Sequence, residues 1–341
     1  MSKLLTQLGL AALLAVLGSQ ALFTWFGAVQ PAISPLLIAS LALIALLATL
    51  ALVIYIMWLA LWEREPNPRS RLMAVGKRYA APAKVASQLG PLVLTFVFLA
   101  AFGTFKVMIP RIHPFALDGF LSDLDRLVFR TDPWRLTHAI IGPVGTRFLD
   151  IAYGMWFPAW TGAVIYFSLF ASDDLKRRFF LSFFAVWSII GIVLATILSS
   201  AGPCFLGLIG HPYAARFSGL LPLADAPWNE HAQALLAKAY QTGNNGLAMG
   251  ISAMPSVHVA VAALLMFAAR CYHRAAYIGA TTFYALIFLG SVHFGWHYVS
   301  DGIAGTLGAW LIWKATERRS GERQGLKSRP DPATAKIPTT E

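Results

Sequence analysis

Two short clusters of polar and ionisable residues stand at the starts of apolar segments, where they could do chemistry at a membrane surface. The first is Met254-Pro255-Ser256-Val257-His258, which runs directly into an apolar stretch. We expect Ser256 to cap the following helix, so that the free N–H groups of the first turn would form an anion site beside His258. The alternative interpretation is a Pro-Ser helix start with one interfacial histidine.

The second cluster runs from His293 to Gly302 and enters the last apolar segment. His297 and Asp301 are four residues apart, so on a helix they would share a face. A carboxylate that accepts a hydrogen bond from one ring nitrogen fixes the tautomer and raises the basicity of the other nitrogen, as a nucleophilic or basic histidine requires. The alternative is an ion pair that only satisfies a buried aspartate.

The elements that position these clusters are predicted to be membrane helices. Apolar residues make up 57% of the 341 residues, charged residues 13%, and mean hydropathy is +0.62. These values exclude a soluble globular domain, a disordered chain and a coiled coil. A span needs about 20 apolar residues, and eight candidate spans lie near 8–29, 36–62, 89–109, 149–171, 179–201, 257–272, 275–292 and 299–316. The predicted fold is therefore an all-α polytopic membrane bundle of about eight transmembrane helices.

Charge then predicts the orientation of the bundle. When the loops are assigned alternately, 19 of the 27 Lys and Arg residues fall on one side and seven on the other, with Lys106 inside a span. The positive-inside rule puts both termini in the cytoplasm, so loops 202–256 and 293–298 face outward. The two histidines, the carboxylate and the helix start would then converge on one outward pocket of a cell-membrane protein. That combination fits phosphoryl transfer through a phosphohistidine, without a metal or another cofactor.

The rest of the chain divides into segments of different character. Residues 1–88 hold the first helices and a cytoplasmic loop, 89–316 the catalytic core, and 317–341 a polar tail that we expect to be disordered. The first span could be a signal peptide, but its apolar run favours a retained helix. Within 110–148, charges alternate with apolar residues, which predicts short amphipathic helices on the outer membrane face with Trp134 as an interfacial anchor. No basic-aromatic surface suited to nucleic acid is found.

The two clusters carry a family resemblance. Pro255-Ser256-Val257-His258 and His297-Tyr298-Val299-Ser300-Asp301 resemble the second and third signature motifs of the type 2 phosphatidic acid phosphatase superfamily. Met254, Tyr298 and Gly202-Pro203-Cys204 are closer to its inositol phosphorylceramide synthase branch. The resemblance implies a phosphatidic acid phosphatase type 2-like core, with His297 as nucleophile, Asp301 as its orienting carboxylate, His258 as the acid for the leaving oxygen, and Ser256 as a phosphate ligand. The implied substrate is a phospholipid or another lipid-linked phosphate, drawn from among the membrane lipids.

The chain departs from the family pattern in its cations. The first motif, Lys-x6-Arg-Pro, would fall at 195–203, where Ala195 and Gly202 carry no charge. Ser291 occupies the position that usually holds an arginine six residues before the nucleophile. Arg216 and Lys238 in the outer loop are therefore the candidate phosphate-binding residues; Arg111 and Arg130 are further possibilities.

Three other function classes use the same features differently. His293, His297 and Asp301 have acceptable spacing for a zinc or iron site, so a zinc-dependent membrane lipid amidohydrolase is the main alternative. A transporter would need charged residues near the bilayer midplane at broken helices. An intramembrane serine protease would need a better separated pair than Ser256 and His258.

Overall fold

The computed structural model describes residues 2–26, 82–220, 223, 225–243 and 249–317, together with a few isolated positions between 53 and 71. The predicted span at 36–62 and the predicted tail at 317–341 lie almost wholly outside the described residues. Every regular element of the described part is helical, which confirms the all-α prediction.

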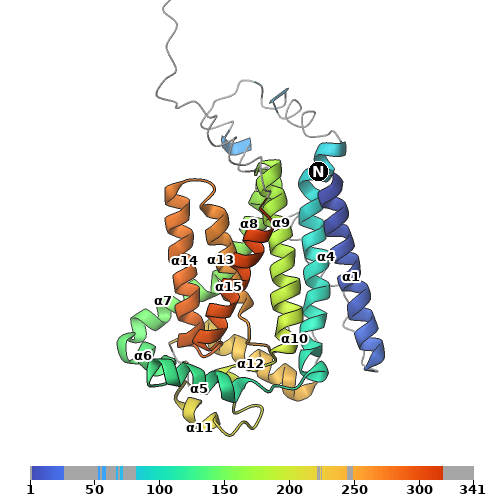
Figure 1. The fold of residues 1–341 in the computed structure, drawn as a ribbon. Helices are drawn as coiled ribbons and strands as arrows, with labels where there is room; N and C mark the ends of the chain where they lie inside the picture. The colour runs from blue at the N-terminus through green and yellow to red at the C-terminus, as the bar shows by residue number, and fades with distance from the viewer. Residues whose placement is uncertain are drawn as a thin grey trace, which may run out of the picture.

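Long upright helices form the body of the molecule (Figure 1). They are α1 (Ser2–Trp25), α4 (Pro82–Ile112), α8 (Trp156–Leu169), α9 (Asp173–Ala185), α13 (Val257–Ala269), α14 (Arg274–His293) and α15 (Val299–Ala315). Helix α9 continues through the π-helical η1 (Val186–Leu194) into α10 (Ala195–Ile197). α1 packs along α4, and α13 packs against both α14 and α15. The start of α1 and the end of α15 lie at the same end of the bundle (Figure 1).

Four helices of the described part are long and apolar enough to cross a membrane: α1, α4, the continuous helix Asp173–Ile197, and α14. The shorter α13 is also apolar, whereas the predicted number of about eight spans is not confirmed. One predicted span, 149–171, is broken at Met155 between α7 (Pro143–Gly154) and α8. Pro158 is consistent with the break, because a proline has no N–H to donate to the carbonyl of residue 154 and its ring would clash with that carbonyl in a regular helix.

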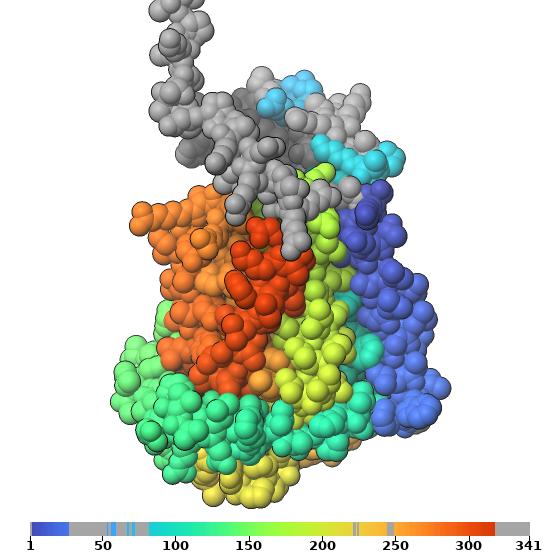
Figure 2. All heavy atoms as spheres, viewed as in Figure 1, coloured from blue at the N-terminus to red at the C-terminus, as the bar shows by residue number. Residues whose placement is uncertain are grey.

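A layer of short helices covers the other end of the bundle. It consists of α5 (Asp118–Phe129), α6 (Pro133–Ile140), α7, the 3-10 turn η2 (Pro203–Phe205), α11 (Ala214–Phe217), the 3-10 turn η3 (Ser218–Leu220) and α12 (Pro227–Thr242). Figure 2 shows the layer as a belt across the lower ends of the upright helices. The short amphipathic helices expected within 110–148 are therefore present as α5 and α6.

The amphipathic character of α5 is inverted relative to a helix on a soluble protein. Asp118 and Asp125 are buried, whereas Phe120 and Leu127 are about two-thirds exposed, at 64% and 66%.

The prediction that Trp134 is an interfacial anchor was wrong. Its side chain is only 7% exposed and packs in a cluster with Leu121, so it does not form an interfacial anchor.

Candidate active site

His258 lies in the first turn of α13, and its surroundings hold it in place. The hydroxyl of Ser256 accepts a hydrogen bond from the N–H of Val259 at 3.3 Å, which confirms the predicted helix cap. The indole N–H of Trp156 donates to the carbonyl of His258 at 3.0 Å, and the Trp156 ring centroid is 4.2 Å from that of the imidazole. Tyr153 stacks on the imidazole at 5.5 Å. The ring orientation is therefore set by aromatic packing.

His297 and Asp301 meet at the start of α15, although not on one helical face as predicted. The helix begins at Val299, so His297 precedes it. Asp301 Oδ2 accepts the backbone N–H of Tyr298 at 3.0 Å and lies 3.4 Å from His297 Nδ1. The contact therefore arises because the Asp301 side chain folds back over the first turn, as in a capping box. With Nδ1 beside the carboxylate, His297 Nε2 is the ring nitrogen left for chemistry.

A cavity of about 440 Å³ joins the two histidines. Their ring centroids are 5.9 Å apart, and both side chains line this cavity. Aromatic side chains form much of the wall: Phe96, Phe102, Tyr153, Trp156, Phe157, Trp160, Trp187, Phe205, Trp228 and Trp296. The cavity therefore has the volume and apolar wall of a small-molecule site, with a few convergent polar groups at one place.

A model of the PAP2 superfamily, the type 2 phosphatidic acid phosphatases, matches residues 121–315, more than half of the chain. The chain belongs to the PAP2 superfamily. The matched range begins in α5 and ends with α15, so it includes His258, His297 and Asp301. No curated protein and no solved structure matches the chain. Membership of the PAP2 superfamily, in a helical protein with apolar spans, suggests enzyme activity of the phosphatase or phosphotransferase type.

Ser256, which the family resemblance implies is a phosphate ligand, stabilises the start of α13 in this structure. It is fully buried, its hydroxyl caps α13, and it is not among the residues that line the cavity. Its backbone N–H donates to the carbonyl of Asp301 at 3.1 Å. A Cβ added at Gly305 of α15 would lie 2.4 Å from the carbonyl oxygen of Ser256. The two helix starts that carry the histidines are thus in direct backbone contact.

The two basic residues expected to bind phosphate lie elsewhere. Arg216 donates to Asp123 at 3.0 Å and pairs closely with Asp132, so carboxylates of the chain occupy its guanidinium. Lys238 is exposed on α12. Neither residue lines the cavity that holds the two histidines.

Lys106 of α4 does line that cavity, and sequence reasoning missed it. The signal was present, because Lys106 is a basic residue inside the predicted span 89–109 and belongs to neither set of loops. It lies before the range matched by the PAP2 model, so the family motifs do not include it.

His293 is not directed at His297 and Asp301. Its Nδ1 is 3.1 Å from the hydroxyl of Thr137, and its Nε2 is 3.0 Å from the hydroxyl of Thr146. Both ring nitrogens are therefore engaged by α6 and α7, and the metal site predicted by the alternative reading is not assembled. Within the described ranges, no group of three or more His, Cys, Asp or Glu side chains is placed to hold a metal ion.

Two aspartates of α5 fix the loops around His297. Asp125 accepts the N–H groups of Val299 at 2.7 Å and Ser300 at 3.2 Å, and so caps α15 from another helix. Burial raises the pKa of Asp125, and these two hydrogen bonds oppose that rise. Asp118 accepts the N–H groups of Ala201 and Gly202 at 2.8 and 2.9 Å.

The remaining loop contacts tie Trp296 and the Gly-Pro-Cys segment to the same site. Gly202 has φ +96°, and a Cβ there would lie 2.6 Å from the carbonyl oxygen of Trp296. The Trp296 indole N–H donates to Asn229 at 2.6 Å, and the Asn229 side-chain amide donates to Asp150 at 2.7 Å. The roles of the buried carboxylates Asp118, Asp125 and Asp150 could not be assigned from the sequence, because their hydrogen-bond partners are 78 to 180 residues away.

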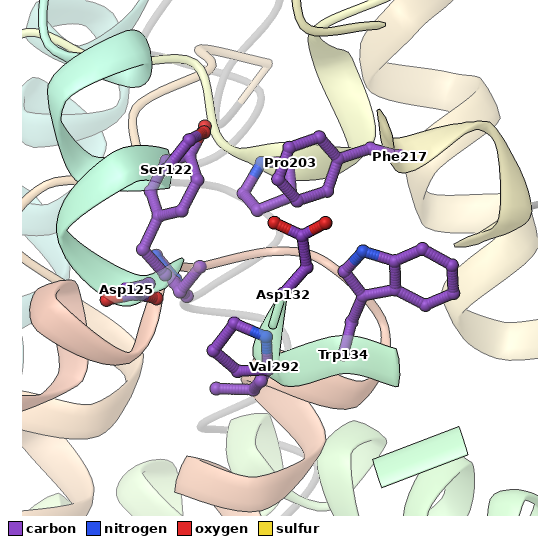
Figure 3. A pocket seen from close by; sticks show the side chains of 10 residues that line it. Ser122, Asp125, Asp132, Trp134, Pro203, Phe217 and Val292 are labelled. Atoms are coloured by element: carbon purple, nitrogen blue, oxygen red, sulfur yellow. The ribbon is translucent and has the colours of Figure 1, made fainter. Parts of the chain in front are cut away.

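A second, much smaller pocket of about 10 Å³ lies on another side of His297. Asp125 and Asp132 line it, and Figure 3 shows the carboxylate of Asp132 pointing into it near Trp134. At about 10 Å³ this pocket holds no more than a water molecule, and the Asp125 carboxylate in its wall disfavours an anion, whereas Lys106 favours one on the side of the large cavity. The residues that line the two pockets therefore favour an anion in the large cavity over one in the small pocket.

Proposed function

We propose that this PAP2 superfamily member is a membrane-embedded lipid phosphotransferase or phosphatase that works through a phosphohistidine. The observation that carries the proposal is the pair of imidazoles 5.9 Å apart across one aromatic cavity, with the Asp301 carboxylate beside His297. A phosphorus atom between two such rings could be attacked from one side and lose its alcohol on the other.

In the proposed reaction, His297 Nε2 attacks phosphorus and the bond to the leaving alcohol oxygen breaks. Asp301 stabilises the positive charge that develops on the imidazole. Protonated His258 donates its proton to the departing alcohol, a contribution typically worth about 10²–10⁴-fold. Water or an acceptor alcohol then attacks the phosphohistidine, giving its proton to His258 and restoring both histidines.

Between water and an alcohol as the acceptor, we favour the alcohol, which would make the enzyme a transferase. Support comes from the resemblance of Met254, Tyr298 and Gly202-Pro203-Cys204 to the inositol phosphorylceramide synthase branch. The apolar, aromatic lining suits a lipid that enters from the bilayer, so the proposed donor is a lipid-linked phosphoester. The test is lipid analysis of a deletion strain, in which the donor should accumulate and the product should disappear.

The proposed location of the site is the extracytoplasmic face of the cell membrane, with both termini cytoplasmic. The charge asymmetry between the loops supports it. In a background lacking Cys204 and Cys271, a cysteine introduced at Ser218 should react with an impermeant thiol reagent added to intact cells. A cysteine at Ser70 should react only after the cells are opened. The reverse labelling would contradict this orientation.

The proposed chemistry is tested by trapping the phosphoenzyme and by inhibiting turnover. Turnover should survive EDTA and be inhibited by vanadate, which mimics a pentacoordinate phosphoryl group. His297→Ala should abolish a covalent phosphoenzyme. Loss of turnover on chelation with rescue by zinc would support the metal-dependent alternative, and a phosphate trapped on His258 would reverse the two roles.

A further inference from the structure

The large cavity is lined by one lysine side chain, which comes from a helix outside the family motifs. Lys106 lies in α4, six residues before the helix ends at Ile112. It lines the cavity together with His258 and His297. Among the described lining residues, no other Lys or Arg and no Asp or Glu is present.

Lys106 has no ion pair and no side-chain hydrogen bond with any part of the chain that the structure describes. Lys106 is partly exposed, and its ammonium group lies against an apolar wall, where neither an opposite charge nor a hydrogen-bond acceptor offsets the hydration that it loses there. The surrounding wall is aromatic and aliphatic and offers no carboxylate. An anionic ligand in the cavity would supply the missing partner.

Backbone packing fixes the position of Lys106 relative to the histidines. A Cβ added at Gly250 would lie 2.4 Å from the carbonyl carbon and oxygen of Lys106 and 2.7 Å from the N–H nitrogen of Val107. The segment that leads into α13 therefore lies directly on α4 at this residue. Three residues later, the N–H of Ala253 donates to the carbonyl of Ser200 at 2.9 Å, which anchors the same segment.

We propose that Lys106 binds the phosphoester anion that lies between His258 and His297, in the role left open by the uncharged motif positions Ala195, Gly202 and Ser291. This inference rests on the proposed function, because it places the phosphate of that reaction. The ligand class is a phosphate monoester or diester, with its oxygens toward α4 and its organic part along the aromatic wall.

The test measures the binding of inorganic phosphate and of vanadate to the purified full-length protein in detergent. Trp156, Trp228 and Trp296 line the cavity, so tryptophan fluorescence provides a readout independent of turnover. Lys106→Met should weaken binding about 10- to 100-fold, the range expected for loss of a charge-assisted hydrogen bond. Lys106→Arg should bind within a few-fold of the wild type, and Lys3→Met, on the exposed start of α1, should bind equally well.

The outcomes separate this inference from the proposed function. Lys106→Met with wild-type affinity, or a loss of affinity in Lys238→Met instead, would overturn the role of Lys106 even if His297→Ala abolishes turnover. Absence of saturable binding by the wild type would overturn it as well. Turnover that persists in His297→Ala would instead contradict the proposed function. Lys106→Gln serves as the second neutral variant if the Met variant fails to fold.

Discussion

Adding a methyl group at Gly305 should move the start of α15 away from the start of α13. In Gly305→Ala, the new Cβ would lie 2.4 Å from the carbonyl oxygen of Ser256, whereas ordinary contacts begin at 3.4 Å. The starts of α13 and α15 must therefore move apart by about 1 Å. That movement would strain the hydrogen bond from Ser256 N–H to the Asp301 carbonyl and shift His258 relative to His297.

The expected change in stability of Gly305→Ala is the balance of two opposing effects. Overpacking costs about 1–3 kcal/mol, whereas replacing a helical glycine by alanine gains up to about 1 kcal/mol. The net effect is a destabilisation of about 1–2 kcal/mol, or several degrees in Tm. Because a misplacement of about 1 Å at reacting groups costs about 100-fold, kcat/KM should fall by about that factor.

The assay is turnover of p-nitrophenyl phosphate or a short-chain lipid phosphate, with Tm measured by tryptophan fluorescence on the same samples. Gly279→Ala in α14 is the matched control, because a Cβ there meets nothing within 4 Å. It should keep wild-type activity, and its Tm should be equal to or slightly higher than that of the wild type, because only the helix-propensity gain remains. If Gly305→Ala retains wild-type kcat/KM and Tm, the backbone contact between the two helix starts does not set the geometry of the site.

Three further predictions concern the surrounding charges. Asp125→Ala should lower the stability by about 1–3 kcal/mol, measured by thermal unfolding, because it removes the carboxylate that accepts two N–H groups of α15; an unchanged Tm would contradict this. The Tyr213 hydroxyl, and then Arg216, lower the pKa of Asp123 in the folded protein. The ionised Asp123 carboxylate therefore stabilises the fold fully above its unfolded-state pKa, and this contribution is lost as pH falls below about 4. The Tm difference between the wild type and Asp123→Asn should therefore be larger at pH 5 than at pH 3, and a constant difference would refute it. His258→Ala should lose much less activity with p-nitrophenyl phosphate than with an alkyl phosphate, since a good leaving group needs little protonation; equal losses would show that His258 is not the leaving-group acid.

Several features of the site were predictable because they depend on neighbours in sequence. The Ser256 cap needs only a serine before an apolar run, and the pairing of His297 with Asp301 needs only a spacing of four residues. The break near Met155 was equally local, since Pro158 was visible, but the apolar run across it concealed the break. Hydropathy reports how apolar a segment is and does not report its direction.

Only the tertiary structure decided which charged groups share the cavity. By sequence, Arg216 and Lys238 were reasonable phosphate ligands, yet Arg216 is neutralised by Asp123 and Asp132, and Lys238 is exposed on α12. Lys106 enters the cavity because α4 packs beside the segment before α13. A charge pattern along the chain predicts the side of a membrane and local pairs. Convergence of α4, α13 and α15 depends on side-chain packing between segments up to about 200 residues apart, which no local pattern encodes.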